Sequence, residues 1–119
     1  MSLPTDKLLE IVIEGLKNNK AKEIHILNLK KLENSISEYF VVCHGTSRTH
    51  VSSTANSVEK EVKNVLGEYP WKKEGYTNGE WFLVDYSSIV VHVFQKEARD
   101  FYNIEELWAD AETTVIEEE

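Results

Sequence analysis

The cysteine and histidine side chains of this sequence are its first candidates for nucleophiles or metal ligands: Cys43, His25, His44, His50 and His92. A cysteine nucleophile needs an accessible thiolate beside a base, whereas Cys43 lies in the most apolar segment of the chain, which predicts a buried, inert thiol. The histidines lack ligand spacings such as His-x-x-x-His, and one cysteine adds too few ligands for a structural zinc site. We therefore expect no metal, no cofactor and no cysteine chemistry.

A second candidate is the segment Gly45-Thr46-Ser47, which follows a predicted strand and precedes a predicted helix. In a mixed sheet this arrangement resembles the nucleotidyltransferase fold, in which acids on neighbouring strands hold two magnesium ions. Those acids are missing here, because Glu59 and Glu61 point about 200° apart on a helix, and Asp85 alone makes no two-metal site. The glycines form none of the usual phosphate-binding motifs. The sequence thus predicts a nucleotidyltransferase-like topology without the catalytic carboxylates.

The elements that position these residues follow from hydrophobic spacing. Apolar residues repeat at helical intervals after Thr5 and again after Val51, where Thr46 or Ser47 is the expected N-cap and Gly67 the expected stop. A third amphipathic helix is predicted at the end of the chain, with apolar positions at Phe101, Ile104, Leu107, Trp108 and Ala111. Five strands are predicted, over about 24–29, 39–43, 72–77, 80–86 and 89–94. The order αββαβββα predicts an α+β fold with a mixed five-stranded sheet and helices on at least one face.

The last three strands form a predicted meander whose register can be derived from its turns. Asn78-Gly79 is a strong hairpin signal, and it sets Trp81 opposite Tyr76 and Asp85 opposite Lys72; the turn at Ser87-Ser88 then sets Leu83 opposite His92. One face becomes apolar and suited to packing under helices, through Phe82, Val84, Tyr86, Ile89, Val91 and Val93. The other mixes aromatic and polar groups, namely Lys72, Glu74, Tyr76, Trp81, Leu83, Asp85, Val90, His92 and Phe94. That composition fits either a protein-binding patch or the solvated side of a half-exposed sheet.

Charge is concentrated at the end of the chain. From Glu97 onward there are nine acids against one base, Arg99, and this segment carries the whole net charge of −8. The preceding residues balance, so the sequence has no basic stripe for phosphate neutralisation, and direct nucleic-acid binding is not expected. The acidic end would suit a basic protein partner, although a solvated helix that runs into a frayed acidic tail, at 113–119, explains most runs of this kind.

Length and composition predict a single cytoplasmic domain. The chain has 119 residues, of which 41% are hydrophobic, so one core is expected, over about residues 5–112. The longest apolar run, Tyr39 to Cys43, is too short to cross a membrane, and no signal segment or presequence opens the chain. Because a single cysteine cannot form an internal disulfide, nothing in the sequence indicates an oxidising compartment. We expect a bacterial cytoplasmic protein with no membrane partner.

Several stretches together resemble the ribosomal silencing factor family, also called the Iojap family, over nearly the whole chain. The stretches are Ser37–Val42, Gly45–Ser47 with His50-Val51, Glu74-Gly75, Trp81–Tyr86, Val90–Phe94 and Arg99–Trp108. Each is weak alone, and their order and spacing make the resemblance specific. Two mild departures are Glu38, where the family usually has aspartate, and Ser87-Ser88, which replaces a turn that more often contains glycine.

The resemblance implies a non-enzymatic protein that binds the large ribosomal subunit through ribosomal protein fourteen of that subunit. It implies that the bound protein silences translation by blocking association with the small subunit. The contact surface implied by the resemblance centres on Trp81, Leu83 and Asp85, with Tyr86 at the strand end. His92, Tyr76 and Lys72 join it through the predicted strand pairing.

Two other classes of function stay open at this point. One is a nucleotidyltransferase-like enzyme that uses Ser47, Asp85 and a further acid. The other is a self-associating scaffold in which the Trp81 side of the sheet pairs with itself, and the sequence leaves open whether the free protein forms a homodimer. Nucleotide and magnesium would raise the melting temperature of the enzyme only, and size-exclusion chromatography of Trp81→Ala would identify the scaffold.

Overall fold

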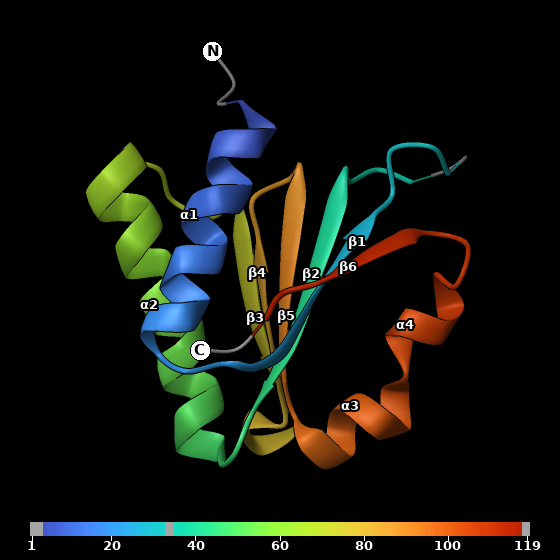
Figure 1. The fold of residues 1–119 in the computed structure, drawn as a ribbon. Helices are drawn as coiled ribbons and strands as arrows, with labels where there is room; N and C mark the ends of the chain where they lie inside the picture. Colours follow the sequence, from blue (N-terminus) through green and yellow to red (C-terminus); the bar gives the residue numbers. More distant parts are fainter. Residues whose placement is uncertain (1–3, 33–34, 118–119) are drawn as a thin grey trace.

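A six-stranded mixed sheet with helices on both faces makes up the fold (Figure 1). The computed structural model describes residues 4–32 and 35–117, with only the backbone of Tyr76 and Thr77. The helices are α1 (Thr5–Asn18), α2 (Arg48–Leu66), α3 (Lys96–Tyr102) and α4 (Ile104–Leu107). The strands are β1 (Lys22–Asn28), β2 (Tyr39–Gly45), β3 (Lys72–Tyr76), β4 (Trp81–Asp85), β5 (Ile89–Gln95) and β6 (Glu112–Val115).

The strand order β3-β4-β5-β2-β1-β6 combines one parallel pair with antiparallel neighbours. Strands β2 and β5 run parallel at the centre, where Val41 lies opposite Val91, and the remaining pairs are antiparallel. The α+β class and the mixed sheet are therefore confirmed. The predicted number of five strands is wrong, because β6 adds a sixth strand beside β1. The likeness to the nucleotidyltransferase topology stays a prediction.

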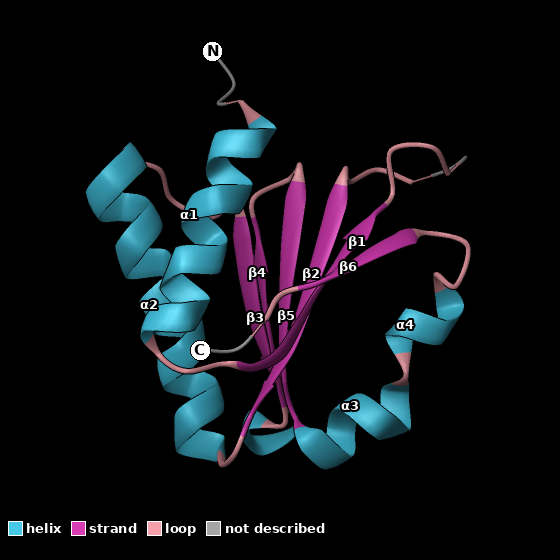
Figure 2. Cartoon of the chain, viewed as in Figure 1, coloured by secondary structure: helices cyan, strands magenta, loops and turns pink. Residues whose placement is uncertain are grey.

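Helices cover the two faces of the sheet unequally (Figure 2). Helices α1 and α2 pack over one face, where Val12, Leu16 and Val58 meet Val91 and Val93 of β5 in the larger core cluster. Helices α3 and α4 lie on the opposite face. Their Ala98 and Ile104 join a smaller cluster on β1, β2 and β5 that contains Leu27, Val42 and Phe94. Strands β3 and β4 form the outer part of that second face.

Residue types explain where α2 begins and ends and how closely α1 packs against it. The Ser47 hydroxyl caps α2 by accepting from the His50 backbone N–H, and Gly67 ends the helix with a φ of 68°. Gly15 allows α1 to approach α2, since a Cβ there would lie 2.9 Å from the Cα of Val58. The predicted cap and stop of α2 are thus confirmed.

The end of the chain differs from the sequence prediction. Instead of one amphipathic helix, α3 ends at Asn103, which adopts the left-handed conformation with φ 45° and ψ 50°, and α4 restarts after it. Asparagine tolerates this conformation better than other non-glycine residues. The break leaves Phe101 and Leu107 exposed, although both were predicted on a buried face. Residues 112–115, predicted as the end of the core and the start of a frayed tail, form β6.

The predicted register of the meander is confirmed at every paired position. Lys72 lies opposite Asp85, Tyr76 opposite Trp81, and Leu83 opposite His92. The turn after β3 is longer than the two residues predicted and contains a short 3-10 segment, Thr77–Gly79. The register is unchanged, because the loop is extended symmetrically about Asn78-Gly79. In the described ranges, no helix is long and apolar enough to cross a bilayer.

Candidate protein-binding face

The partly exposed outer part of the second sheet face is the candidate site, and we call it the Trp81 face. It consists of Trp81, Leu83 and Asp85 on β4 with Lys72 and Glu74 on β3. These residues share one side of the sheet because side chains alternate along a strand and directly paired residues point the same way. Helices α3 and α4 cover β5 and β2 and leave this part of the sheet open. The structure therefore brings together four predicted contact residues: Trp81, Leu83, Asp85 and Lys72.

Trp81 is held in a fixed orientation by three neighbouring rings. Its indole Nε1–H donates a hydrogen bond to Nδ1 of His92 at 3.2 Å. The indole stacks on Phe94 with a centroid distance of 4.8 Å, and the ring of Tyr102 on α3 lies 5.0 Å away. A large aromatic side chain fixed in this way loses little freedom when a partner covers it. Trp81 thus combines partial exposure with an ordered conformation.

His92 lies beneath Trp81 and is too deeply buried to contact a binding protein directly. The side chain is only 4% exposed, and its burial lowers the pKa to about 4, so the ring is neutral at pH 7. Because Nδ1 accepts from Trp81, the neutral ring carries its proton on Nε2. This nitrogen is buried and has no hydrogen-bond partner among the described atoms. The sequence grouped His92 with the contact residues, and the structure places it as the support of Trp81.

Asp85 and Lys72 lie side by side but make different local contacts. Oδ1 of Asp85 accepts from the backbone N–H of Ser87 at 2.7 Å, which stabilises the turn after β4. Nζ of Lys72 pairs with Oε1 of Glu74 at 2.8 Å, and this hydrogen bond raises the pKa of the lysine. Lys72 lies opposite Asp85 in the strand register, but its ion pair is with Glu74.

Of the two predicted tyrosines, Tyr86 packs on the other face of the sheet, and the side chain of Tyr76 is not described. Tyr86 follows β4 and packs with the core beneath α1 and α2, where burial raises the pKa of its phenol. Its hydroxyl oxygen is buried without a hydrogen-bond partner in the described ranges. Tyr76 lies opposite Trp81 in the strand register, but its side chain lies outside the described part of the chain.

A buried polar network behind the face was not found from the sequence. Arg99 of α3 is 8% exposed, and its Nε donates to Oε1 of Glu105 at 2.8 Å. Its Nη1 donates to Nδ1 of His44 at 2.9 Å and to the carbonyl oxygen of Glu23 at 2.8 Å. His25 contacts the other oxygen of Glu105 at 3.2 Å. This network fixes α3 and α4 to β1 and β2, and the single base in an acidic segment was the signal that could have revealed it.

The side chains that could act as nucleophiles, Cys43 and Ser47, have structural roles. Cys43 is fully buried, its Sγ donates to the carbonyl oxygen of His92, and burial raises its pKa to about 12. The prediction of a buried thiol is confirmed. Ser47 serves as the cap of α2. Over residues 4–32 and 35–117 we find no cluster of three histidine, cysteine or acidic side chains that could hold a metal.

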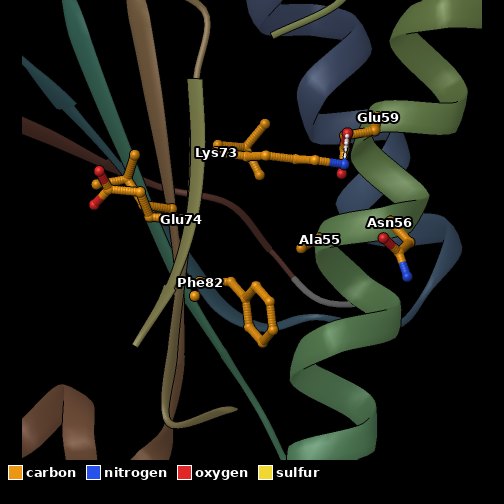
Figure 3. Close-up of a pocket in the computed structure, with 9 residues that line it drawn as sticks. Ala55, Asn56, Glu59, Lys73, Glu74 and Phe82 are labelled. Atoms are coloured by element: carbon orange, nitrogen blue, oxygen red, sulfur yellow. Dashed lines mark hydrogen bonds and ion pairs between the residues drawn. The ribbon is translucent and has the colours of Figure 1, made fainter. Parts of the chain in front are cut away.

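A cleft of about 250 Å³ lies on the opposite side of β3 and β4, between these strands and α2 (Figure 3). Lys73 and Phe82 point from the strands toward α2, whereas Glu74 points away from it toward the Trp81 face. Nζ of Lys73 pairs with Oε1 of Glu59 across the cleft at 3.1 Å. This ion pair spans the cleft and connects α2 to the edge strand β3.

Comparisons with known proteins agree with this architecture. A family model described as "Ribosomal silencing factor during starvation" matches residues 2–119. A ribosomal silencing factor from Halalkalibacterium halodurans is 35% identical over 115 residues, which cover 97% of each chain. The mouse protein named "Mitochondrial assembly of ribosomal large subunit protein 1" is 28% identical over 84% of this chain and 44% of its own. A crystal structure of a Chromobacterium violaceum protein superposes with a TM-score of 0.83 at 36% identity, covering 90% of this chain and 88% of that one. The chain belongs to the ribosomal silencing factor family.

Proposed function

We propose that this protein binds the large ribosomal subunit through ribosomal protein fourteen of that subunit and prevents the small subunit from joining. The observation that carries the proposal is the Trp81 face: an aromatic side chain fixed by His92 and Phe94 on the open part of a sheet. Family membership supports a ribosomal partner, and the name of the mouse relative refers to the large ribosomal subunit. In this proposal the protein is a regulator and performs no reaction. Its location in a bacterial cytoplasm stays a prediction.

Each residue of the Trp81 face has a distinct proposed role. Trp81 is the central anchor, because tryptophan side chains at the centre of an interface supply a large share of its binding energy. Leu83 extends the apolar contact, and Asp85 offers its carboxylate to a basic group of the partner. Lys72 forms the polar rim with Glu74. His92 acts through Trp81, as a positioning residue.

The size of the molecule supports steric exclusion as the mechanism. The described chain measures 36 × 34 × 28 Å, with a radius of gyration of 13.1 Å. The two ribosomal subunits must come into direct contact to join, so a rigid body of this size at the joining face would hold them apart. A patch on the order of 800 Å² per partner is sufficient for a specific protein complex. Binding one ribosomal protein is therefore enough in this mechanism.

Co-sedimentation with isolated large subunits tests the proposal. Trp81→Ala should lower the affinity by about thirtyfold or more, because losing a central anchor costs about 2 kcal/mol or more. Tyr69→Ala is the matched control, since Tyr69 is 66% exposed and lies beside Lys63 of α2, on the other side of the sheet. Equal binding of Trp81→Ala and Tyr69→Ala would contradict the proposal. Circular dichroism of both variants shows whether the fold is retained.

A further inference from the structure

A second exposed surface borders the Trp81 face, and we call it the α3 shelf. It surrounds a hollow of about 250 Å³ lined by Glu80, Gln95, Glu97, Ala98, Phe101 and Tyr102. The Phe101 side chain is 81% exposed although it belongs to an ordered helix. Its ring meets Tyr102 edge to face with a centroid distance of 5.2 Å. Two aromatic rings thus form one wall of an open hollow, and the carboxylates of Glu80 and Glu97 also line it.

The charged side chains that line the shelf, Glu80 and Glu97, are both acidic. Arg99, the one base after Glu97 in the sequence, is buried and held by Glu105, so it does not reach the surface. Lys96 is nearby but pairs with Asp100 at 2.9 Å. Within the described ranges, Glu80 and Glu97 are in no ion pair. A surface of this kind attracts basic groups and repels RNA phosphates.

The shelf is continuous with the Trp81 face. The ring of Tyr102 contacts both Trp81, at 5.0 Å, and Phe101, at 5.2 Å, so the three rings form an uninterrupted aromatic path from β4 to the end of α3. The backbone N–H of Gln95 donates to the carbonyl oxygen of Glu80, which fixes the two walls of the hollow together. A partner that covers Trp81 therefore lies within reach of the shelf.

We propose that the α3 shelf receives a lysine or arginine side chain of the same ribosomal protein that covers Trp81. The cation would contact the aromatic rings of Phe101 and Tyr102 and pair with the carboxylates of Glu80 and Glu97. The inference rests on the proposed function, and it adds a second, electrostatic contact to the aromatic anchor. Ribosomal RNA is the alternative occupant, and the negative charge of the shelf argues against it.

A charge variant provides the first test. Glu80→Gln with Glu97→Gln removes two shelf charges, and Glu106→Gln with Asp110→Asn removes two exposed charges near α4 as the matched control. In binding to isolated large subunits at low salt, the shelf variant should lose roughly tenfold in affinity, and its affinity should fall less steeply with added salt. The control should bind as the unmodified protein does. If the shelf variant also does so while Trp81→Ala loses binding, the inference is wrong and the proposed function stands.

A cross-linking experiment identifies the occupant. Cys43 is the only cysteine and is fully buried, so Phe101→Cys introduces a single accessible thiol for a photoactivated cross-linker. With large subunits, the label should attach to ribosomal protein fourteen, and adding Trp81→Ala should abolish the product. Leu107→Cys, whose position is 76% exposed on α4, is the control and should give no such product. A product with RNA, with another protein or with none would overturn the inference. Loss of binding by the unmodified protein would instead overturn the proposed function.

Discussion

At the residue scale, the candidate site depends on how Trp81 is supported. The indole is hydrogen-bonded to His92, stacked on Phe94 and in contact with Tyr102, so its exposed part is presented in one orientation. His92 is buried and neutral, and it uses its one acceptor nitrogen for this bond. The anchor and its support therefore form a unit in which a change at His92 alters the position of Trp81.

The burial of His92 predicts a specific loss of stability in acid. Its pKa is about 4 in the folded protein and about 6.5 in the unfolded chain, so between these values only the unfolded chain binds the proton. The contribution of His92 to the free energy of unfolding should fall by about 3 kcal/mol as the pH falls from 6.5 to 4, and this contribution should change little below 4. His92→Gln keeps an acceptor for Trp81 and does not titrate. Urea unfolding of both proteins at several pH values measures the difference, and parallel pH profiles would contradict the assignment.

We expect the negative charge of Asp85 to contribute to partner binding. Asp85→Asn keeps the Oδ1 acceptor for the Ser87 N–H, so the turn should be retained. Losing the charge should cost about 1 kcal/mol, roughly fivefold in affinity, at low salt. The salt dependence of binding to large subunits should become weaker, because one screened charge pair is removed. An unchanged salt dependence would show that Asp85 meets no basic group.

At the element scale, the network around Arg99 determines where α3 and α4 lie. The guanidinium connects Glu105 of α4 to His44 of β2 and to the β1 backbone at Glu23. These contacts hold α3 in the place from which Tyr102 reaches Trp81. The network is therefore structural, and its effect on the Trp81 face is indirect.

Removing the Arg99 side chain should loosen both short helices. Arg99→Met removes the hydrogen bonds that Arg99 makes to Glu105, to His44 and to the Glu23 carbonyl oxygen, which should lower the free energy of unfolding by about 2 kcal/mol. Lys96→Met is the control, because the surface pair with Asp100 contributes about 0.5 kcal/mol or less. Thermal unfolding compares the two variants, and hydrogen exchange reports on α3 and α4. Equal melting temperatures would show that the network adds no stability.

The hairpin and the helix caps could be predicted from the sequence because local residue types determine them. Asn78-Gly79 fixed the register of β3 with β4, and Ser47 and Gly67 marked the ends of α2. The break at Asn103 was missed because the apolar spacing continues across it. Strand β6 was missed because its side chains are all exposed, although Thr113, Thr114 and Val115 are residue types that favour strands.

The candidate face was predictable in part. Alternation along β4 places Trp81, Leu83 and Asp85 on one side, and the structure agrees. The burial of His92 could not be read from this pattern, because it depends on Phe40 packing against its ring and on α3 and α4 covering the neighbouring strands. Long-range packing thus decided which residues of the face meet solvent.

At the scale of the whole molecule, shape and charge both fit exclusion of the small subunit. The two helical layers and the sheet form a body 28 Å across in its shortest dimension. The net charge of −8 lies from Glu97 onward, on the segment that includes α3 and α4. Bound beside the joining face, this segment would repel the RNA phosphates of an approaching subunit. Steric and electrostatic effects would then act in the same direction.

The most direct test of steric exclusion is a titration of subunit joining. Purified large and small subunits are mixed with increasing amounts of the protein, and joined particles are measured on sucrose gradients. Inhibition should saturate near one protein per large subunit and should disappear with Trp81→Ala. Inhibition at amounts far below one per subunit would indicate turnover and contradict steric exclusion, and full inhibition by Trp81→Ala would contradict the assigned face.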